Sequence, residues 1–272
     1  MSTHLRRQWK RGLAELRYDE SPKRIRARLG GIDVVDTTEA LLVWEPGWIV
    51  PQYAVRADVV HGELVPDDRE RPTLAPGDPP YDSQSGRRIH TAPGRALSLR
   101  YPGGTALGAA FRLDEAELYG YVVLEFLAFD GWLEEDEEIT GHPHDPYVRI
   151  DVRRSARTVR VEREGQVLAE TVRSLALFET HLPTRYYLPR DDVVVPLRPT
   201  TTTSVCAYKG LASYWSADVG GREVEDVAWS YERPLAEVPA IAGLVCFAAE
   251  GTDLILDGVR QDRPRAVWSA PD

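Results

Sequence analysis

One stretch of the chain repeats at a fixed offset, and this repeat restricts the possible folds more than any other feature. Residues 21–60 align with residues 155–194 at an offset of 134, without a gap. Of the 40 aligned pairs, 11 are identical, among them Tyr53 and Tyr187. Chance alone would give about two or three identities. We infer an internal duplication, so the chain should fold as two related units in a pseudo-twofold arrangement.

The second copy opens with a pattern that is typical of β-structure. Residues 157–163 (R-T-V-R-V-E-R) alternate apolar and charged side chains, as a half-buried strand does. Glu164 and Gly165 follow as a two-residue turn, and residues 166–170 are the return strand of a predicted hairpin. Further short strands are predicted over residues 175–179, 185–189 and 191–197. The fold should therefore be mainly β.

The end of each copy has an ambiguous apolar run. Residues 118–133 would suit a buried helix by length alone, but their counterpart, residues 241–256, contains the turn sequence E-G-T-D. We therefore predict a strand–turn–strand unit in both copies. A short helix should precede each one, over residues 114–119 and 234–242.

These patterns divide the chain into five segments. They are an N-terminal extension (1–20), a first β-domain (21–138), a linker (139–154), a second β-domain (155–258) and a C-terminal tail (259–272). Residues 65–88 are rich in Pro, Asp, Gly and Ser and should form an exposed loop. The acidic run 134–138 is interpreted as a solvated edge that discourages strand pairing, and the tail should be frayed.

Composition limits the classes of partner. The formal charge of −10 and the pI near 5.2 argue against a nucleic-acid-binding protein, which would present a basic face. No apolar run reaches the roughly 20 residues that span a membrane, and the N-terminus lacks the apolar core of a signal peptide. Two cysteines without a C-x-x-C pair fit neither a disulfide framework nor a zinc site. We expect a cytoplasmic monomer or weak homodimer without cofactors.

Residues 202–215 (T-T-S-V-C-A-Y-K-G-L-A-S-Y-W) are the best candidate for a functional stretch. The chain has three lysines among 33 basic residues, and Lys209 lies in the middle of this aromatic segment. In the first copy, residues 90–99 align with 206–215, with Pro93 opposite Lys209 and Leu99 opposite Trp215. The first copy therefore lacks the motif.

Each candidate residue has a functional and a structural interpretation. Lys209 could contact an anionic or carbonyl ligand or act as a desolvated amine, and it could equally form a buried ion pair with Glu179. The aromatic candidates could line a pocket or belong to the core; they are Tyr208, Tyr214, Trp215 and Trp229.

The remaining candidates are weaker. Glu179, Tyr187 and Arg190 recur in the first copy, which favours a scaffold role, although we include them among the ligand-binding candidates. Cys206 is more typical of a small buried apolar residue than of a nucleophile. His142, His144 and Asp145 are metal-ligand types, but the prolines around them favour a linker turn, so no metal site is predicted.

The second copy closely resembles the family catalogued as domain of unknown function 427. The resembling motifs are V-R-V-E-R-E-G (159–165), R-Y-Y-L-P-R-D-D-V (185–193), C-A-Y-K-G-L-A-S-Y-W (206–215) and D-V-A-W-S-Y-E-R-P (226–234). One departure is Ala207, where the family usually has proline. The first copy, over about residues 21–133, looks like a degenerate member. The resemblance implies a β-tent, in which two small sheets meet at an angle. The family is sometimes labelled as nucleotidyltransferase-like, but the resemblance implies no established reaction.

Three functional hypotheses follow. The leading one is a protein that binds a small molecule in an aromatic pocket around Lys209. The second is a transferase- or hydrolase-like enzyme in which Lys209 works with Glu179 or Tyr208 as an acid–base pair. The third is a scaffold that binds another protein through an exposed apolar patch.

Overall fold

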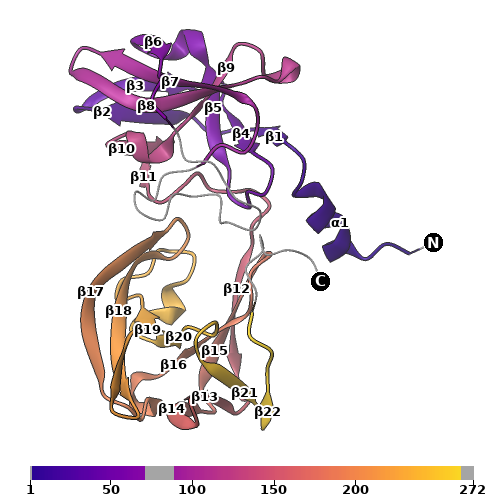
Figure 1. Cartoon of the computed structure of the whole chain (residues 1–272), viewed down its shortest axis with the longest axis vertical. Helices are drawn as coiled ribbons and strands as arrows, with labels where there is room; N and C mark the ends of the chain where they lie inside the picture. Colours follow the sequence, from indigo (N-terminus) through magenta and orange to yellow (C-terminus); the bar gives the residue numbers. More distant parts are fainter. Residues whose placement is uncertain (1, 71–88, 265–272) are drawn as a thin grey trace. The chain divides into compact units, whose positions relative to one another are not determined.

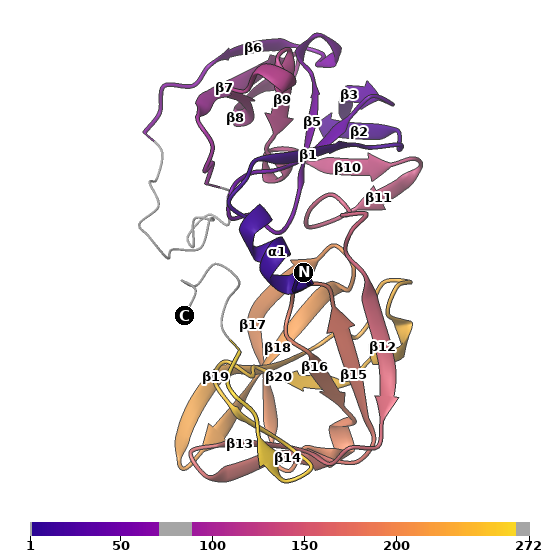
Figure 2. The same cartoon turned by 90° about the vertical axis from the view of Figure 1, so that its right-hand side faces the viewer.

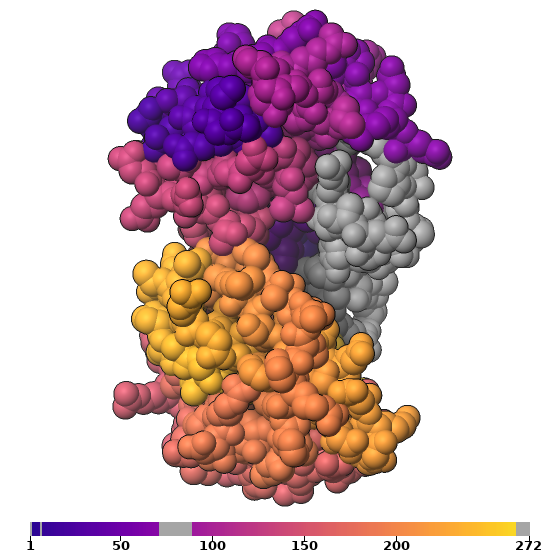
Figure 3. Space-filling model, turned by 90° about the vertical axis from the view of Figure 1, so that its left-hand side faces the viewer, coloured from indigo at the N-terminus to yellow at the C-terminus, as the bar shows by residue number. Residues whose placement is uncertain are grey.

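The computed structural model describes residues 2–70 and 89–264, which divide into a first unit ending at Asp145 and a second beginning at Pro146 (Figure 1 and Figure 3). The mainly β fold is confirmed, because the single α-helix, α1 (Leu5–Gly12), and five single-turn 3-10 helices are the helical elements of these residues. Most of the predicted exposed loop and of the predicted tail lie outside the described residues. Among those described, no helix combines the length and apolar character needed to cross a membrane.

The first unit consists of two antiparallel sheets. The seven-stranded sheet has the order β1 (Arg17–Glu20), β4 (Leu41–Trp44), β5 (Gln52–Arg56), β9 (Tyr121–Leu124), β8 (Gly104–Leu113), β7 (Gly94–Tyr101), β6 (Glu63–Pro66). The four-stranded sheet has the order β11 (Glu137–Ile139), β10 (Gly131–Glu134), β2 (Ile25–Leu29), β3 (Ile32–Thr37). Strand β1 begins inside the predicted N-terminal extension.

The second unit has the same two sheets. Its seven-stranded sheet has the order β12 (Ile150–Ser155), β15 (Ser174–Glu179), β16 (Arg185–Leu188), β20 (Val245–Phe247), β19 (Arg222–Ser230), β18 (Gly210–Val219), β17 (Leu197–Cys206). Its four-stranded sheet, given in the same direction as its counterpart, has the order β22 (Val259–Arg260), β21 (Asp253–Leu256), β13 (Val159–Arg163), β14 (Gln166–Thr171). In Figure 2, β13 and β14 lie across one end of the seven-stranded sheet. Strand for strand the order equals that of the first unit, and β12 begins within the predicted linker.

Each seven-stranded sheet has an inner and an outer face. The inner face packs against the four-stranded sheet; in the second unit this core contains Val159, Leu168, Leu188 and Val245. The outer face of the second unit carries a separate apolar cluster with Leu177, Tyr187 and Ile241. The first unit repeats this division.

Two local predictions can be compared directly with the structure. The hairpin of β13 and β14 is confirmed: Glu164 and Gly165 have φ of 52° and 81°, as a two-residue turn of this type requires. The strand predicted over 191–197 is wrong. The 3-10 helix η4 (Arg190–Asp192) lies there, because the Asp192 carboxylate accepts hydrogen bonds from Thr171 and Arg173 at 2.5 Å and holds the chain in a turn.

The strand–turn–strand prediction is confirmed in both units. The 3-10 helices η2 (Ala116–Leu118) and η5 (Pro239–Ile241) are shorter than the helices expected there. After η2 the chain forms β9, a second turn, η3 (Phe126–Ala128), and β10; after η5 it forms β20 and then β21. In each case the first strand joins the seven-stranded sheet and the second joins the four-stranded sheet.

The pairing across the sheets shows that the two units differ by one residue after β4 and β15. Leu41 pairs with Ala54, whereas its counterpart Leu175 pairs with Tyr187. Eight residues separate the paired residues Val43 and Gln52 in the first unit, and seven separate Leu177 and Arg185 in the second. Since successive strand residues point to opposite faces, the identical pair Tyr53 and Tyr187 are not structural counterparts. Tyr53 corresponds to Tyr186 and contributes to the inner core, while Tyr187 lies on the outer face.

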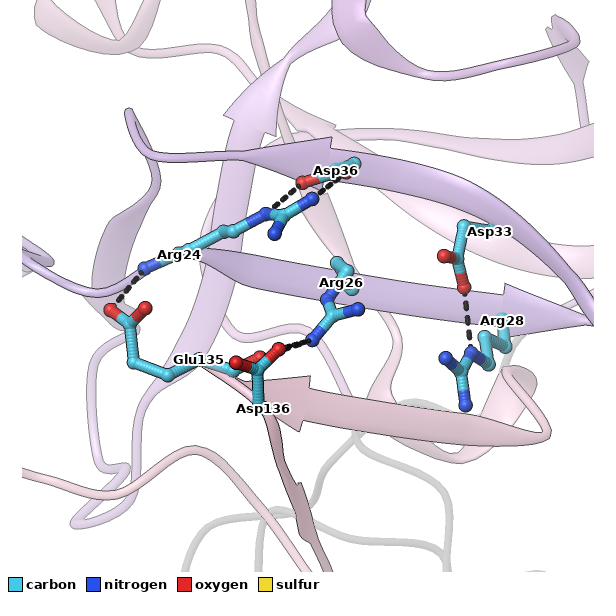
Figure 4. Close-up of polar contacts among 7 residues, drawn as sticks. All are labelled: Arg24, Arg26, Arg28, Asp33, Asp36, Glu135 and Asp136. Carbon is cyan, nitrogen blue, oxygen red and sulfur yellow. Dashed lines mark hydrogen bonds and ion pairs between the residues drawn. The ribbon is translucent and has the colours of Figure 1, made fainter.

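Charged residues cover the solvent face of the first four-stranded sheet. Arg24, directly before β2, and Arg26 and Arg28 on β2 pair with carboxylates of β3 and of the turn after β10 (Figure 4). The pairs are Arg24–Asp36 at 2.5 Å, Arg26–Asp136 at 2.7 Å and Arg28–Asp33 at 2.6 Å. The Arg24 and Arg28 pairs are exposed, so each contributes little to stability.

We had predicted that the whole acidic run 134–138 is a solvated edge, and this is correct only in part. Glu135 has a positive φ of 53° in the turn between β10 and β11, and Glu137 and Glu138 lie on the edge strand β11. Glu134, however, is buried, because its carboxylate accepts hydrogen bonds from the Tyr53 hydroxyl at 2.6 Å and from the His144 backbone at 3.1 Å, and it pairs with Lys23.

Candidate functional site

Four side chains form a row across the outer face of the second seven-stranded sheet. Tyr187 on β16 pairs with Cys246 on β20, Cys246 pairs with Trp229 on β19, and Trp229 pairs with Tyr214 on β18. Cross-strand partners place their side chains on the same face, close enough to touch. We call these residues, Tyr187, Cys246, Trp229 and Tyr214, the aromatic row.

The row is joined by polar contacts as well as by packing. The Trp229 indole donates a hydrogen bond to the Tyr187 hydroxyl at 3.3 Å, and its ring centroid lies 6.4 Å from that of Tyr214. The Tyr214 hydroxyl lies 2.9 Å from the Ser204 hydroxyl on the edge strand β17. Tyr187 is 1% exposed, whereas Trp229 and Tyr214 are half-buried, so one end of the row reaches the surface.

Arg185 adds a positive charge above the row. Its guanidinium lies 5.4 Å from the centroid of the Trp229 ring, within the range of a cation–π contact. Glu250 holds it in place through two hydrogen bonds of 2.6 and 3.0 Å. We had not singled out either residue. The period of two in β16 would have placed Arg185 on the same face as Tyr187.

The buried groups of the row are uncharged. Burial raises the pKa of the Cys246 thiol to about 12, so this cysteine is not a thiolate nucleophile at neutral pH. Burial also raises the pKa of Tyr187 and of the neighbouring Tyr231 above the ordinary value of a tyrosine.

Lys209 lies in the turn between β17 and β18 and forms an ion pair with Glu179 at the end of β15. Its ammonium is 2.5 Å from the Glu179 carboxylate, and the two side chains are 11% and 9% exposed. The pair lies beside the row, since Glu179 is two residues beyond Leu177 on β15 and Leu177 belongs to the same outer-face cluster as Tyr187. The predicted ion pair between Lys209 and Glu179 is therefore present.

The first unit holds the corresponding carboxylate differently. Glu45 is completely buried and accepts hydrogen bonds from the backbone of Thr91 at 2.7 Å and of Ala92 at 3.0 Å, with the His90 ring 2.7 Å away. The fold thus places a buried carboxylate at this position in both units. A lysine partner is particular to the second.

The remaining sequence candidates are not all in one place. Trp215 packs with the inner core, donates to the Ser230 hydroxyl at 3.0 Å, and lies under the Arg190 guanidinium at 3.9 Å. Trp215 and Arg190 are therefore on the opposite face from the aromatic row. Tyr208 is buried in the β17–β18 turn and Cys206 is half-buried at the end of β17. The structure brings together Lys209, Glu179, Tyr187, Tyr214 and Trp229 from the predicted set.

The residues with metal-ligand chemistry are engaged in other contacts. The His144 ring is 3.1 Å from Glu134, the His142 ring is 2.7 Å from the carbonyl of Pro143, and Asp145 accepts a hydrogen bond from Trp44 at 2.9 Å. Within residues 2–70 and 89–264, no three His, Cys, Asp or Glu side chains are grouped as a metal site.

Comparison with known proteins identifies one family. Residues 151–258, which run from β12 through β21, match the family model labelled NTP_transf_9 and described as a domain of unknown function (DUF427). No curated protein matches the chain.

Proposed function

We propose that the second unit, whose residues 151–258 match the DUF427 family model, binds a small molecule on its aromatic row. The supporting observation is a comparison within the chain. At the positions of Tyr187, Cys246, Trp229 and Tyr214, the first unit has Ala54, Val123, Phe111 and Ala96. The first unit therefore has the same strand order with smaller or purely apolar side chains at these four positions. The fold does not require the two tyrosines and the tryptophan.

The chemistry of the row favours a flat ligand without net charge. Half-buried Trp229 and Tyr214 offer ring faces for stacking, and the Tyr214 and Ser204 hydroxyls offer hydrogen bonds at the exposed end. The nearby charges compensate each other, as Lys209 pairs with Glu179 and Arg185 with Glu250. A charged ligand would have to break one of these pairs.

Binding should be lost when Trp229 is replaced by leucine. We expect a saturable thermal shift of the wild-type protein with a neutral planar fragment, using nicotinamide and indole as first probes, and an affinity at least about tenfold weaker for Trp229→Leu. The matched control is Phe111→Leu, the same change at the corresponding position of the first unit, which should keep wild-type affinity. Equal binding by Trp229→Leu, or no binding by the wild type, would contradict the proposal.

An enzyme is the second candidate, and the 2.5 Å contact between Lys209 and Glu179 favours it, because an adjacent amine and carboxylate can exchange a proton. Turnover of a bound fragment that disappears in Lys209→Ala would favour the enzyme. Binding without turnover would favour the small-molecule-binding protein. If neither binding nor turnover were observed, the scaffold hypothesis would remain.

We further propose that the two units arose by duplication and that the protein acts in the cytoplasm. The shared strand order supports the first point. The second is supported by Cys206 and Cys246, both of which are free thiols, as is usual in a reducing compartment.

A further inference from the structure

A cleft of about 370 Å³ opens between the two sheets of the second unit, on the opposite side of the seven-stranded sheet from the aromatic row. Tyr186 on β16 and Leu254 and Leu256 on β21 form its walls. Its volume is that of a site for a small ligand. Nothing in the aromatic-row proposal uses these residues.

The first unit fills the corresponding place with a carboxylate of its own. Strand pairing relates the two units here: Ile25 pairs with Glu134, and its counterpart Val159 pairs with Leu256. The backbone N–H of Arg24 donates a hydrogen bond to the Glu135 carboxylate, and the backbone N–H of Thr158 donates one to the Asp257 carboxylate in the same way. These matching hydrogen bonds confirm the register. Leu256 therefore occupies the position of Glu134.

The groups that hold Glu134 have counterparts in the cleft. Tyr53, whose hydroxyl donates to Glu134 at 2.6 Å, corresponds to Tyr186. Lys23, which pairs with Glu134, corresponds to Arg157 at the offset of 134. Tyr186 and Arg157 both line the cleft. The second unit has thus kept a hydroxyl and a cation and has replaced the carboxylate between them with leucine.

From this comparison we propose that the cleft binds a small monocarboxylate, whose charged group takes the place of the Glu134 carboxylate beside Tyr186 and Arg157. Arg157 already donates its Nε–H to Asp257 at 2.6 Å, but a guanidinium has five N–H donors and its terminal pair matches a carboxylate. Arg263, which pairs with Asp253 at 3.1 Å, places a second guanidinium at the rim of the cleft.

The other residues that line the cleft restrict the chemical class of the ligand. Phe178 is 45% exposed at the cleft and, with Leu254, provides an apolar surface for a ring or a short chain. Asp262 also lines the cleft, and its negative charge disfavours di- and triphosphates. Benzoate combines one carboxylate with a ring and is the probe of choice, and benzamide is its neutral isostere.

Titration calorimetry of the full chain tests the proposal. We expect saturable binding of benzoate, with at least about tenfold weaker binding of benzamide. Arg157→Gln and Tyr186→Phe should each weaken benzoate binding about tenfold. Arg222→Gln removes a more exposed arginine that pairs with Glu164 at 2.5 Å outside the cleft, and it should bind benzoate as the wild type does.

A gain-of-charge variant gives an independent check. Leu256→Glu restores the carboxylate of the first unit and should abolish benzoate binding, while Trp229→Leu, which disrupts the aromatic row, should leave it unchanged. The proposal fails if the wild type shows no saturable benzoate binding up to about 10 mM. It fails equally if benzamide binds as well as benzoate, or if Arg157→Gln binds benzoate with wild-type affinity.

Discussion

Replacing Lys209 with methionine should lower the free energy of unfolding by about 3 kcal/mol, because the change leaves the Glu179 carboxylate buried without its partner. Both side chains are about nine-tenths buried and their charged atoms are 2.5 Å apart, so water cannot readily replace the ammonium. Urea unfolding followed by circular dichroism, with matched slopes for the two proteins, measures the difference.

Two further variants separate this cause from a general loss of packing. The double variant Lys209→Met with Glu179→Leu removes both charges and should recover most of the lost stability, since an apolar pair of similar volume can replace a buried ion pair. Lys10→Met, on the exposed helix α1, should change stability by no more than about 0.5 kcal/mol. If Lys209→Met were as stable as the wild type, the pair would not be structural and the case for a catalytic or ligand-binding lysine would be stronger.

The first unit should show a pH-dependent stability that originates from Glu134. Burial alone would raise the pKa of this carboxyl group, but hydrogen bonds from His144, Lys23 and Tyr53 outweigh burial and lower the pKa to about 2 from the ordinary 4.5. The folded state therefore favours the ionised form. The stabilisation is complete above pH 4.5 and is lost as the pH falls through the range down to about 2.

The measurement is a comparison of Glu134→Gln with the wild type by urea unfolding at several pH values. At pH 6 the variant should be about 2 kcal/mol less stable, allowing for partial solvent screening, and the difference should shrink steadily as the pH is lowered towards 3. Glu63→Gln, which removes a carboxylate 68% exposed in its pair with Arg100, should show a small difference at every pH. A gap for Glu134→Gln that does not change with pH would refute the assignment.

The two units differ in how they neutralise equivalent buried positions. The Glu45 position keeps its carboxylate in both units and changes the partner, from backbone amides and His90 to Lys209. The Glu134 position changes the carboxylate itself to Leu256 and keeps the tyrosine and the cation. The first exchange preserves a structural pair, whereas the second leaves a cleft.

Local pattern was sufficient for much of the fold. Alternation over residues 157–163 and the Glu164-Gly165 turn correctly predicted the β13–β14 hairpin, because strand period and turn conformation depend on neighbouring residues alone. Comparison of residues 118–133 with residues 241–256 also correctly predicted strands in both segments. The residues around Lys209 and Trp229 were identified as candidates because their residue types are rare in this chain and because the aligned positions of the first segment lack them.

Tertiary structure alone decided which of these candidates share a face. The gapless alignment at an offset of 134 matches Tyr53 to Tyr187, but strand pairing relates Tyr53 to Tyr186. A shift of one residue moves a strand's side chains to the other side of the sheet, at no cost to the apolar pattern that sequence comparison detects.

The sequence therefore determined that the chain forms two β units and that the second differs from the first around Lys209. Long-range pairing determined the rest. It separated Trp215 and Arg190 from the aromatic row, joined Lys209 to Glu179 across 30 residues, and buried Glu134 in an otherwise exposed acidic run. The physical reason is that burial and charge neutralisation depend on which strands become neighbours, and no local pattern of residues contains that information.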